Sequence, residues 1–568
     1  MDFENNSLFN FQTKTFMGLN AEYEVNQNLN VGATVLRLSE RPLTQKTNIG
    51  DEPIANTIFG LNGTYTKETP FLTRAVDAIP FIDTKAKSTI TVQGEYAQLV
   101  PGSPRGIEIG GEPTTYLDDF ENSQTTIDIR NPRAWQLASV PGGQPELFPE
   151  ADASDISYGY NRAKLAWYTI DPLFHGSDSR TPSYIKSNPQ LQSEQYTRAV
   201  YIKEVFPKLE VDKSQAQNIA VLDLAYYPEE KGPYNFDVEP NLPVSAGIDD
   251  QGNLRDPASR WGGIMRDLSS TNFEEQNIEF IQFWMLDPFL EEGATDGGTL
   301  YFNLGSVSED ILKDGKQAIE NGKPADGNLS KLDTTRWGYA PKVRPPVIAF
   351  DNDPASRNIQ DVGYDLLSDA EEQNFTSTSG GQSYLNRIEQ LYGQNLAYNV
   401  AKADPSSDNF LYYRDPLYSE SDIRQRYKNY NNPEGNSDPT PIDGVSAFAT
   451  NNPDIEDING DQTLNTSETY YQYKVVLEPG QLDLSHPYIT DIRDAESDPL
   501  PDNNKVLKSR WIQFRIPIFE PDRKVGPISD FRSIRFVRMF LKDFDEPVIL
   551  RFARLELIRG EWRRYRFN

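Results

Sequence analysis

The sequence reads NIEFIQFWMLD at residues 277–287 and SIRFVRMFLKD at residues 533–543. Aligned without a gap, the two stretches share an isoleucine, a phenylalanine and a final aspartate, and three further apolar positions agree in character. Both stretches are apolar on both faces, as in a central strand that is covered on each side. This repeated element predicts a mainly β fold.

Each copy also stands in the same order of flanking strands. An Arg-Trp stretch precedes each one, RWGGIMRDL at residues 260–268 and RWIQFRIPI at residues 510–518, and an apolar strand follows it. The shared order predicts two related β-sandwich domains of the jelly-roll type, with helical and loop insertions. Chance similarity between two buried strands is the alternative interpretation.

Composition along the chain sets the predicted domain boundaries. Residues 106–335 form the first jelly-roll-like domain, and residues 471–568 complete the second. Between them, residues 336–470 are rich in Asn, Asp, Pro and Ser and are interpreted as a long insertion. Short helices are predicted at residues 308–322, 383–393 and 421–430.

Residues 1–105 differ from the rest of the chain because their apolar residues alternate. Leu19 and Ala21 share one face of a predicted hairpin, and the same pattern returns at residues 57–66 and 88–100. Antiparallel strands of about ten residues with one apolar face are the signature of a transmembrane β-barrel, and a half-buried soluble sheet is the alternative. Four such strands cannot close a barrel, so the membrane interpretation requires strands from outside this sequence.

Charge and composition exclude several function classes. The chain has 55 basic and 85 acidic residues, a net charge of −30 that is spread along its length, and this argues against a nucleic-acid partner because phosphate binding needs clustered cations. Cysteine is absent and histidine occurs only as His175 and His486, which excludes thiolate catalysis, disulfide scaffolds and multi-histidine metal sites. The N-terminus has no signal-peptide pattern, so we expect either a cytoplasmic protein or an internal piece of a longer one.

The sharpest local motif is the stretch DIEDINGDQTLNTSE at residues 454–468. Its alternating oxygen-bearing side chains, with a glutamate at the twelfth position, have the spacing by which an EF-hand-type loop wraps Ca²⁺. The predicted ligands are Asp457, Asn459, Asp461, Thr463 through its carbonyl, Asn465 directly or through water, and Glu468. The pattern is broken at Gln462, which stands where the glycine of the tight turn belongs. We predict a structural calcium ion that stiffens the insertion, with a solvated acidic loop as the alternative.

Acidic clusters elsewhere, such as the one around Asp119 and Glu121, raise the question of catalysis. A glycosidase needs two carboxyl groups about 5 to 10 Å apart in a cleft. With 85 acidic residues, clusters are expected without catalysis, and no Gly-rich phosphate loop, nucleophile elbow or zinc-binding helix motif is present. We predict that the chain is not an enzyme, and a secreted glycosidase using Asp119 or Glu121 ranks third among the functions considered.

Several longer stretches carry a resemblance to a known family. They include LSERPLTQKTNIGDEPIANTIFGL (38–61), YLDDFENSQTTIDIRNPRAWQLAS (116–139), IEFIQFWMLDPF (278–289), YFNLGSVSEDILKDGK (301–316) and IRFVRMFLKDFDEPVILRFARLELIRGEW (534–562). In their sequence and order these stretches resemble the SprA/Sov family, which forms the outer-membrane translocon of the type IX secretion system in Bacteroidota. The resemblance runs from about residue 18 to the C-terminus.

The resemblance implies a very large single-chain β-barrel with a lateral opening, through which folded cargo proteins cross the outer membrane. The implied partners are a PorV-type outer-membrane protein, a periplasmic plug protein, the cargo proteins, the lipid bilayer and the remaining barrel strands of the full-length chain. The implied roles are secretion of surface adhesins and gliding motility. Because family members are several times longer and carry a signal peptide, we expect this chain to be an internal segment, with residues 1–105 as barrel strands and the acidic remainder as an extracellular cap.

A secreted or surface carbohydrate-binding protein built of jelly-roll modules is the main alternative function. Two jelly rolls with a calcium loop suit it equally well, and exposed Trp or Tyr side chains on a concave sheet face would favour it. The tryptophans of this chain stand inside strand-like stretches, where core packing is the better interpretation.

Overall fold

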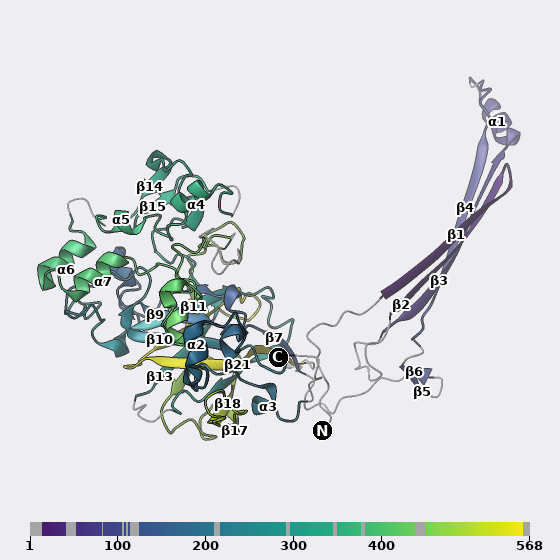
Figure 1. The fold of residues 1–568 in the computed structure, drawn as a ribbon. Helices are drawn as coiled ribbons and strands as arrows, with labels where there is room; N and C mark the ends of the chain where they lie inside the picture. Colours follow the sequence, from purple (N-terminus) through teal and green to yellow (C-terminus); the bar gives the residue numbers. More distant parts are fainter. Residues whose placement is uncertain are drawn as a thin grey trace. The chain divides into compact units, whose positions relative to one another are not determined.

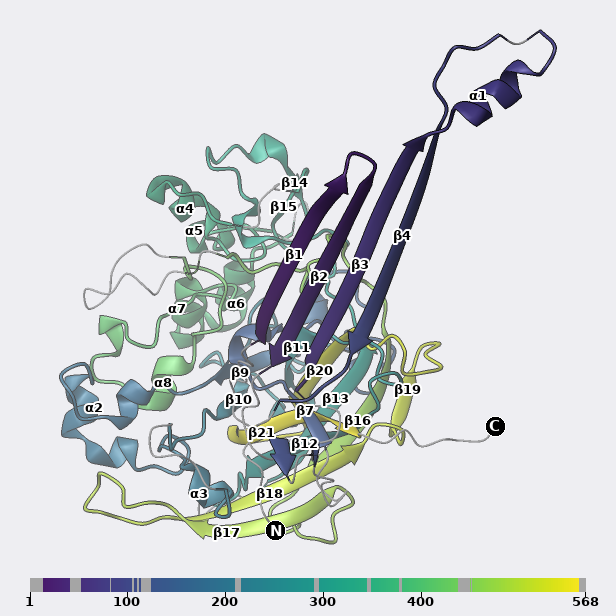
Figure 2. The same ribbon diagram turned by 90° about the vertical axis from the view of Figure 1, so that its right-hand side faces the viewer.

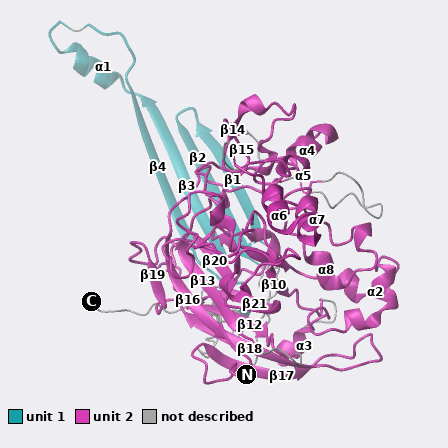
Figure 3. Cartoon of the chain, turned by 90° about the vertical axis from the view of Figure 1, so that its left-hand side faces the viewer, with its two compact units in different colours: residues 1–123 teal, residues 124–568 magenta. Residues whose placement is uncertain are grey.

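The chain divides into two compact units, residues 1–123 and residues 124–568, which Figure 3 distinguishes by colour. Both are mainly β, and their sheets are antiparallel. The computed structural model describes residues 14–40, 53–81, 83–104, 107–109, 112–113, 124–209, 216–290, 296–344, 349–376, 381–437, 450 and 452–560.

The first unit contains one long four-stranded sheet in the sequential order β1-β2-β3-β4 (Figure 2). Its strands are β1 (Lys14–Asn26), β2 (Leu29–Glu40), β3 (Ala55–Glu68) and β4 (Thr89–Val100). The helix α1 (Pro70–Asp77) lies between β3 and β4, and the two-residue strands β5 (Glu108–Ile109) and β6 (Glu112–Pro113) pair with each other. The hairpin and the two further strands predicted in this region are therefore confirmed.

The register of this sheet separates apolar from polar side chains. Residues that lie opposite one another in an antiparallel pair point to the same face. One row across the strands holds Ala21, Ala33, Leu61 and Tyr96. On the same face, the row on one side holds Leu19, Val35, Phe59 and Gln98, and the row on the other side holds Tyr23, Val31, Gly63 and Gly94. The intervening row on the other face holds Glu22, Gly32, Asn62 and Glu95. Over these central rows the sheet thus has one apolar and one polar face. Toward one end, the row of Gly18, Leu36, Ile58 and Leu99 places apolar residues on the second face as well.

The second unit is built on two larger sheets (Figure 1). The seven-stranded sheet has the order β17 (Ile489–Glu496), β18 (Lys508–Pro517), β12 (Ile278–Leu286), β21 (Val548–Gly560), β10 (Leu222–Lys231) and β9 (Ala163–Tyr168), with β7 (Gln124–Asp128) also paired to β21. The six-stranded sheet has the order β19 (Arg523–Val525), β16 (Thr469–Leu477), β13 (Gly298–Ser306), β20 (Phe536–Lys542), β11 (Trp261–Asp267) and β8 (Gln136–Leu137).

The two sheets pack face to face around one apolar core. The Phe283 ring of β12 lies 5.7 Å from the Phe302 ring of β13, centroid to centroid, and 4.7 Å from the stacked Phe514 ring of its neighbour β18. The sheets approach closely at Gly262, where a Cβ atom would lie 3.0 Å from Leu165 Cβ and 3.0 Å from Tyr226 Cε2. Burial of the apolar side chains in this core stabilises the second unit.

The repeated stretches form the central strands of opposite sheets, β12 in one and β20 in the other. All of β20 is buried, as predicted for a strand that is covered on both faces. Each copy pairs with the flanking strands of the other copy: β12 lies between β18 and β21, and β20 lies between β11 and β13. The two copies are therefore interleaved.

This interleaving differs from the predicted division into a first domain at residues 106–335 and a second completed by residues 471–568. Both sheets contain strands from before and after the insertion, so neither half forms a sandwich of its own. The compact units meet near residue 124, whereas the predicted boundary stands at residue 105. Flanking order along the chain repeats faithfully, but it does not determine which copy a strand pairs with.

The helices gather mainly in the insertion between β15 (Tyr339–Pro341), which pairs with β14 (Leu332–Thr334), and β16. They are α4 (Pro354–Gln360), α5 (Asp369–Glu372), α6 (Tyr384–Tyr392), α7 (Leu396–Ala403) and α8 (Ile423–Tyr427), and the short helices α2 (Ser183–Ser187) and α3 (Ile202–Val205) precede them. The predicted helices at residues 383–393 and 421–430 are confirmed as α6 and α8. Ser383 and Asp422 cap them by accepting backbone N–H bonds.

The helix predicted over residues 308–322 is wrong, because only a 3₁₀ turn at Glu320–Gly322 forms there. Lys313 and Gly315 have positive φ angles of 46° and 71°, which a right-handed helix does not allow. Glu309, expected in the first helical turn, is instead buried and accepts backbone N–H groups from residues 458–465. Tertiary contacts have overridden the local helix signal.

Several buried charged groups of the second unit are paired. Arg260, the arginine of the first Arg-Trp stretch, forms an ion pair of 2.8 Å with Asp237, and both side chains are 0% exposed. Arg551 of β21 similarly lies 2.8 Å from Asp223 of β10. Burial raises the pKa of Asp223 to about 6 despite the opposing effect of Arg551. A buried carboxylate therefore has a large cost here even with its partner present.

Candidate functional site

The predicted calcium loop, residues 457–468, lies just before β16 and folds around the carboxylate of Glu309. One oxygen of Glu309 accepts the backbone N–H of Ile458 at 2.7 Å, and the other accepts that of Asn465 at 3.1 Å. Burial raises the pKa of Glu309 to about 7, against the opposing effect of these N–H groups. The interior of the loop is thus occupied by a carboxyl group of the protein.

The predicted ligands fall into two groups. Asn459, Asp461 and Thr463 lie together, since Asp461 accepts hydrogen bonds from the Asn459 amide and the Thr463 hydroxyl. Asp457 instead pairs with Arg344 at 2.8 Å, and Glu468 accepts two bonds of 2.9 and 2.8 Å from Arg538.

The Asn465 side chain donates to the carbonyl of Val307. Gln462, which departs from the calcium pattern, has a positive φ of 67°. The first and last carboxylates of the motif, Asp457 and Glu468, thus form ion pairs with arginines. Calcium at this loop stays a prediction.

The apolar face of the four-stranded sheet is the second candidate surface. Leu19 is 69% exposed, Leu61 59% and Tyr96 60%, although all three belong to its apolar rows. Strands of 12 to 14 residues are also longer than the roughly 9 to 11 residues that a tilted strand needs to cross a bilayer. Among the described residues, no helix has the length and apolar character needed to span a membrane.

Among the described residues, the tryptophans do not favour the carbohydrate-binding alternative. The tryptophans of the described part of the chain are all buried: Trp135, Trp167, Trp261, Trp284, Trp337 and Trp511. They therefore offer no sugar-stacking surface. Asp119 and Glu121, the carboxylates considered for catalysis, lie outside the described residues.

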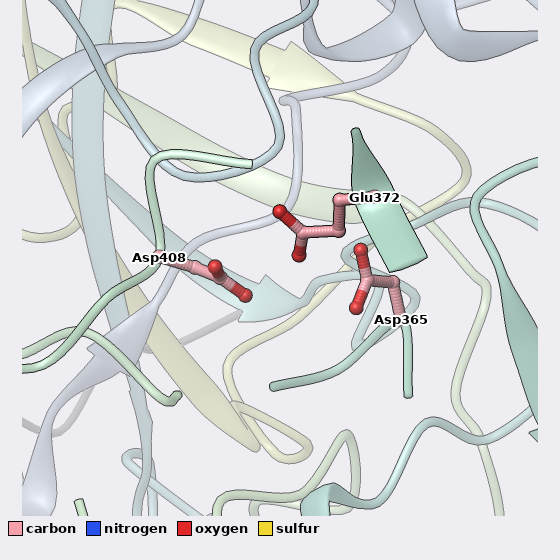
Figure 4. A group of neighbouring side chains, drawn as sticks. All are labelled: Asp365, Glu372 and Asp408. Atoms are coloured by element: carbon pink, nitrogen blue, oxygen red, sulfur yellow. The ribbon is translucent and has the colours of Figure 1, made fainter. Parts of the chain in front are cut away.

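A cluster of buried carboxylates in the insertion was missed by sequence reasoning. Asp365, Glu372 and Asp408 each place a carboxylate oxygen within 4.8 Å of the others, and Figure 4 shows the three groups directed toward one another. All three residues are buried, and Asp408 is 0% exposed. Glu372 also belongs to an adjoining group with Asp369 and Glu434.

The cluster has few hydrogen-bond donors. Ser406 supplies its hydroxyl to Asp365 at 3.2 Å and its backbone N–H to Glu372 at 3.1 Å. No described donor is in hydrogen-bonding geometry with either carboxylate oxygen of Asp408, or with the second oxygen of Glu372. The Tyr234 hydroxyl lies near Asp408 without meeting that geometry.

Electrostatics in the cluster oppose ionisation. Burial raises the pKa of Asp408 well above its usual value, the neighbouring Glu372 raises it further, and the Tyr234 hydroxyl partly counteracts them. Burial likewise raises the pKa of Asp365, with Asp408 adding to the shift and Lys323 opposing it. Lys323, whose charge acts on Asp365, forms its ion pair with Glu371 at 2.6 Å.

The sequence contains a weak signal for this cluster. Asp365, Asp369 and Glu372 follow one another at spacings of four and three, and Asp404 and Asp408 are four apart. Only the fold brings these segments together, and with 85 acidic residues in the chain such spacings are common. The three-dimensional structure was needed to distinguish this carboxylate cluster from the other acidic spacings in the sequence.

Comparison with known families gives one match. A family model described as a motility related/secretion protein, SprA_N, matches residues 383–568, which include α6, Asp408 and the C-terminal strands of both sheets. No curated protein matches the sequence.

Proposed function

We propose that this chain, a member of the SprA/Sov family of motility and secretion proteins, is a segment of an outer-membrane protein-conducting translocon. In this proposal the four-stranded sheet is part of the wall of a β-barrel whose other strands come from the rest of the full-length polypeptide. The second unit is a soluble domain that caps or narrows the pore. The segment makes and breaks no covalent bond.

The observation that carries the proposal is the exposed apolar face of the four-stranded sheet. Its leucines, valines and aromatic residues have no core of their own, and water is an unfavourable neighbour for so continuous an apolar surface. A bilayer would cover this face, while the opposite face, with Glu22, Asn62 and Glu95, would face a water-filled lumen. The central rows of the sheet thus have the separation of faces that a barrel wall requires.

The proposed partners follow from the family resemblance. They are a PorV-type outer-membrane protein, a periplasmic plug, and the folded cargo proteins that pass through the pore during secretion and gliding motility. A lumen wide enough for folded cargo needs a stiff wall and covering domains that close it between passages. The sandwich suits that role because its two sheets share one continuous core.

Cysteine labelling tests the proposal in the native full-length protein. This chain contains no cysteine, so Leu61→Cys and Asn62→Cys place reporters of known position on opposite faces of β3. The unaltered full-length protein is the control for cysteines elsewhere in the polypeptide. We expect a water-soluble maleimide to label position 62 in outer-membrane fractions and to leave position 61 unlabelled until detergent is added. Equal labelling of both positions in intact membranes would rule out a lipid-covered face.

The mass of the native polypeptide is a second test. Antibodies raised against residues 124–568 should detect, in outer-membrane fractions, a chain several times heavier than 64.4 kDa. A band near 64.4 kDa would leave the sheet without its further strands and would move the carbohydrate-binding alternative to first place.

A further inference from the structure

The buried carboxylates of the insertion lack the groups that normally neutralise such a cluster. Elsewhere in the second unit, buried carboxylates such as Asp237 and Asp223 are paired with arginines. Asp408 has neither an ion pair nor a well-aligned hydrogen bond among the described residues, although its side chain is entirely buried. A fully buried acidic group aimed at two others needs a positive charge or a shared proton.

We propose that Asp365, Glu372 and Asp408 bind a divalent cation, calcium, which ties the segments 361–372 and 404–409 to each other. The inference stands on the convergence of their oxygens within 4.8 Å and on the unpartnered oxygens of Asp408 and Glu372. It does not depend on where the four-stranded sheet resides.

The donor set selects the class of cation. All the converging side-chain atoms are oxygens, and no cysteine occurs in the chain, so hard cations are favoured over zinc and other transition metals. Calcium accepts about six to eight oxygens in flexible geometry, whereas magnesium demands a near-ideal octahedron and keeps several waters. Buried carboxylates on the short helix α5 and on the turns around Asp365 and Asp408, extended by Glu434 in the adjoining group, suit calcium better.

A cavity adjoins the cluster. Asp365 and Glu372 line it together with Trp337, and the exposed residues Arg336 and Gln382 line it as well. Two of the three proposed ligands therefore border a cavity that exposed residues also line. Trp337 also places an intrinsic fluorophore in the wall of the same cavity.

The position of the cluster gives the ion a structural role. The backbone N–H of Tyr234, which follows β10, donates to the Ser406 carbonyl, and the Tyr364 N–H donates to the Tyr234 hydroxyl at 2.8 Å. Segments on both sides of the cluster thus contact the sandwich. A bound ion would fix the insertion at this junction by coordinating Asp365 and Asp408 at the same time.

Calcium titration of the full chain, after removal of metal with a chelator, tests the inference. We expect one tightly bound Ca²⁺ per chain by calorimetry and a rise in melting temperature of about 3 °C or more at saturation. The nearly isosteric Asp408→Asn should weaken binding by about 100-fold, because it removes a charged ligand. The matched control is Asp326→Asn, which alters a carboxylate that is 57% exposed and outside both candidate sites, and it should bind calcium like the unaltered chain. Asp461→Asn tests the predicted loop separately.

Two results would overturn the inference. If Asp461→Asn abolishes binding and Asp408→Asn does not, the ion resides in the predicted loop. If the folded, unaltered chain binds no calcium, the three carboxyl groups share protons instead. Should Asp408→Asn fail to fold, Glu372→Gln replaces it.

Terbium luminescence gives an independent readout on the chain with all three carboxylates intact. Tb³⁺ at one equivalent should show tryptophan-sensitised emission that calcium displaces, and Trp337→Phe should abolish that emission while calcium affinity stays unchanged. Trp284→Phe is the control, since Trp284 does not line this cavity. Emission that depends on Trp284 and persists without Trp337 would place the ion elsewhere.

Discussion

The four-stranded sheet and the sandwich contain similar apolar strands, but these are buried in the sandwich and exposed on one face of the sheet. In the sandwich, Phe283 and Phe540 are 0% exposed and lie in strands covered on both faces, whereas in the sheet Phe59 is 45% exposed on an uncovered apolar face. Strand composition alone thus does not determine what an apolar residue contacts. The difference is whether a second layer, supplied by the same chain, covers the apolar face.

The comparison also separates the two regions by what should cover them. The sandwich completes its own burial and should be stable in water without other components. The sheet lacks that burial within the described residues, so its stability should depend on a membrane or on neighbouring strands.

Deleting one phenylalanine ring in each region should show the largest difference. Phe283→Ala removes a ring from the core between the sheets and should lower the free energy of unfolding by about 4 kcal/mol. Phe59→Ala in aqueous buffer should change it by less than about 0.5 kcal/mol. Denaturant unfolding followed by tryptophan fluorescence measures the first effect, because every tryptophan of the chain lies after residue 124.

Far-UV circular dichroism, which also reports β1–β4, measures the second variant. A loss of several kcal/mol in Phe59→Ala without any membrane would show that the sheet has a core of its own.

Breaking a buried ion pair should be almost as costly in the sandwich. Arg260→Met leaves Asp237 charged and 0% exposed, and we expect a loss of about 3 kcal/mol in the free energy of unfolding. Arg532→Met, which removes an exposed pair with Glu274, is the control and should be nearly neutral. Similar midpoints for both variants in a denaturant titration would contradict the view that buried pairing sustains this unit.

A charge on the apolar face of the sheet should matter only in the membrane. Leu61→Arg should destabilise the membrane-inserted state by about 2 kcal/mol or more, since Leu61 stands near the middle of β3. Asn62→Arg, on the opposite face, should be tolerated. The amount of full-length protein recovered in outer-membrane fractions measures both. Equal recovery of the two variants would remove the distinction between the faces.

The pH dependence should also differ, because both histidines lie in the second unit. Burial lowers the pKa of His175 to about 4, against the opposing effect of its bond to the Thr197 carbonyl. A lowered pKa means that the stabilisation is present above the unfolded value near 6.5 and is lost as the pH falls toward 4.

We expect unaltered protein to lose roughly 2 kcal/mol relative to His175→Gln across this interval, allowing for solvent at its partly exposed edge. Unfolding free energies of both proteins between pH 7 and pH 4 measure it. A difference that does not vary with pH would mean that His175 titrates normally.

The smallest effect belongs to an exposed ion pair of the sheet. Lys87 and Glu68 lie 3.0 Å apart with side chains 76% and 59% exposed, so Lys87→Ala should change stability by less than about 0.5 kcal/mol. Thermal unfolding of the membrane-reconstituted protein, followed by circular dichroism, tests this. A clear drop in the melting temperature would place the pair in a less hydrated setting than the described residues indicate.

Sequence alone predicted the strands of the first unit well because alternation encodes the faces directly. The positions that share a face in the sequence pattern, such as Tyr23, Val31 and Gly63, also share a row in the sheet. The double-faced burial of β20 was predictable in the same way, from its apolar run. An apolar pattern within one strand therefore predicts correctly which of its residues share a face or are buried.

Features that depend on distant pairing could not be predicted. The repeat identified β12 and β20 as related, but nothing in it indicated that each pairs with the other copy's flanking strands. The calcium motif had the right spacing, yet Arg344 and Arg538 approach its first and last carboxylates from other parts of the chain. The Asp365, Glu372 and Asp408 cluster was missed for the same reason, since only the fold brings its members together.

The interleaved repeats also impose an order on how the molecule can be made. Strand β12, complete at residue 286, has both of its neighbours at residues 508–560, so it stays unpaired until almost all of this chain has been synthesised and delivered. Pairing between residues so far apart is slow because a long loop must close first. If the chain crosses a membrane before it folds, as the proposed function requires, such a delay keeps β12 unpaired during the crossing. Pairing of β21 with β12 is then the step that completes the seven-stranded sheet.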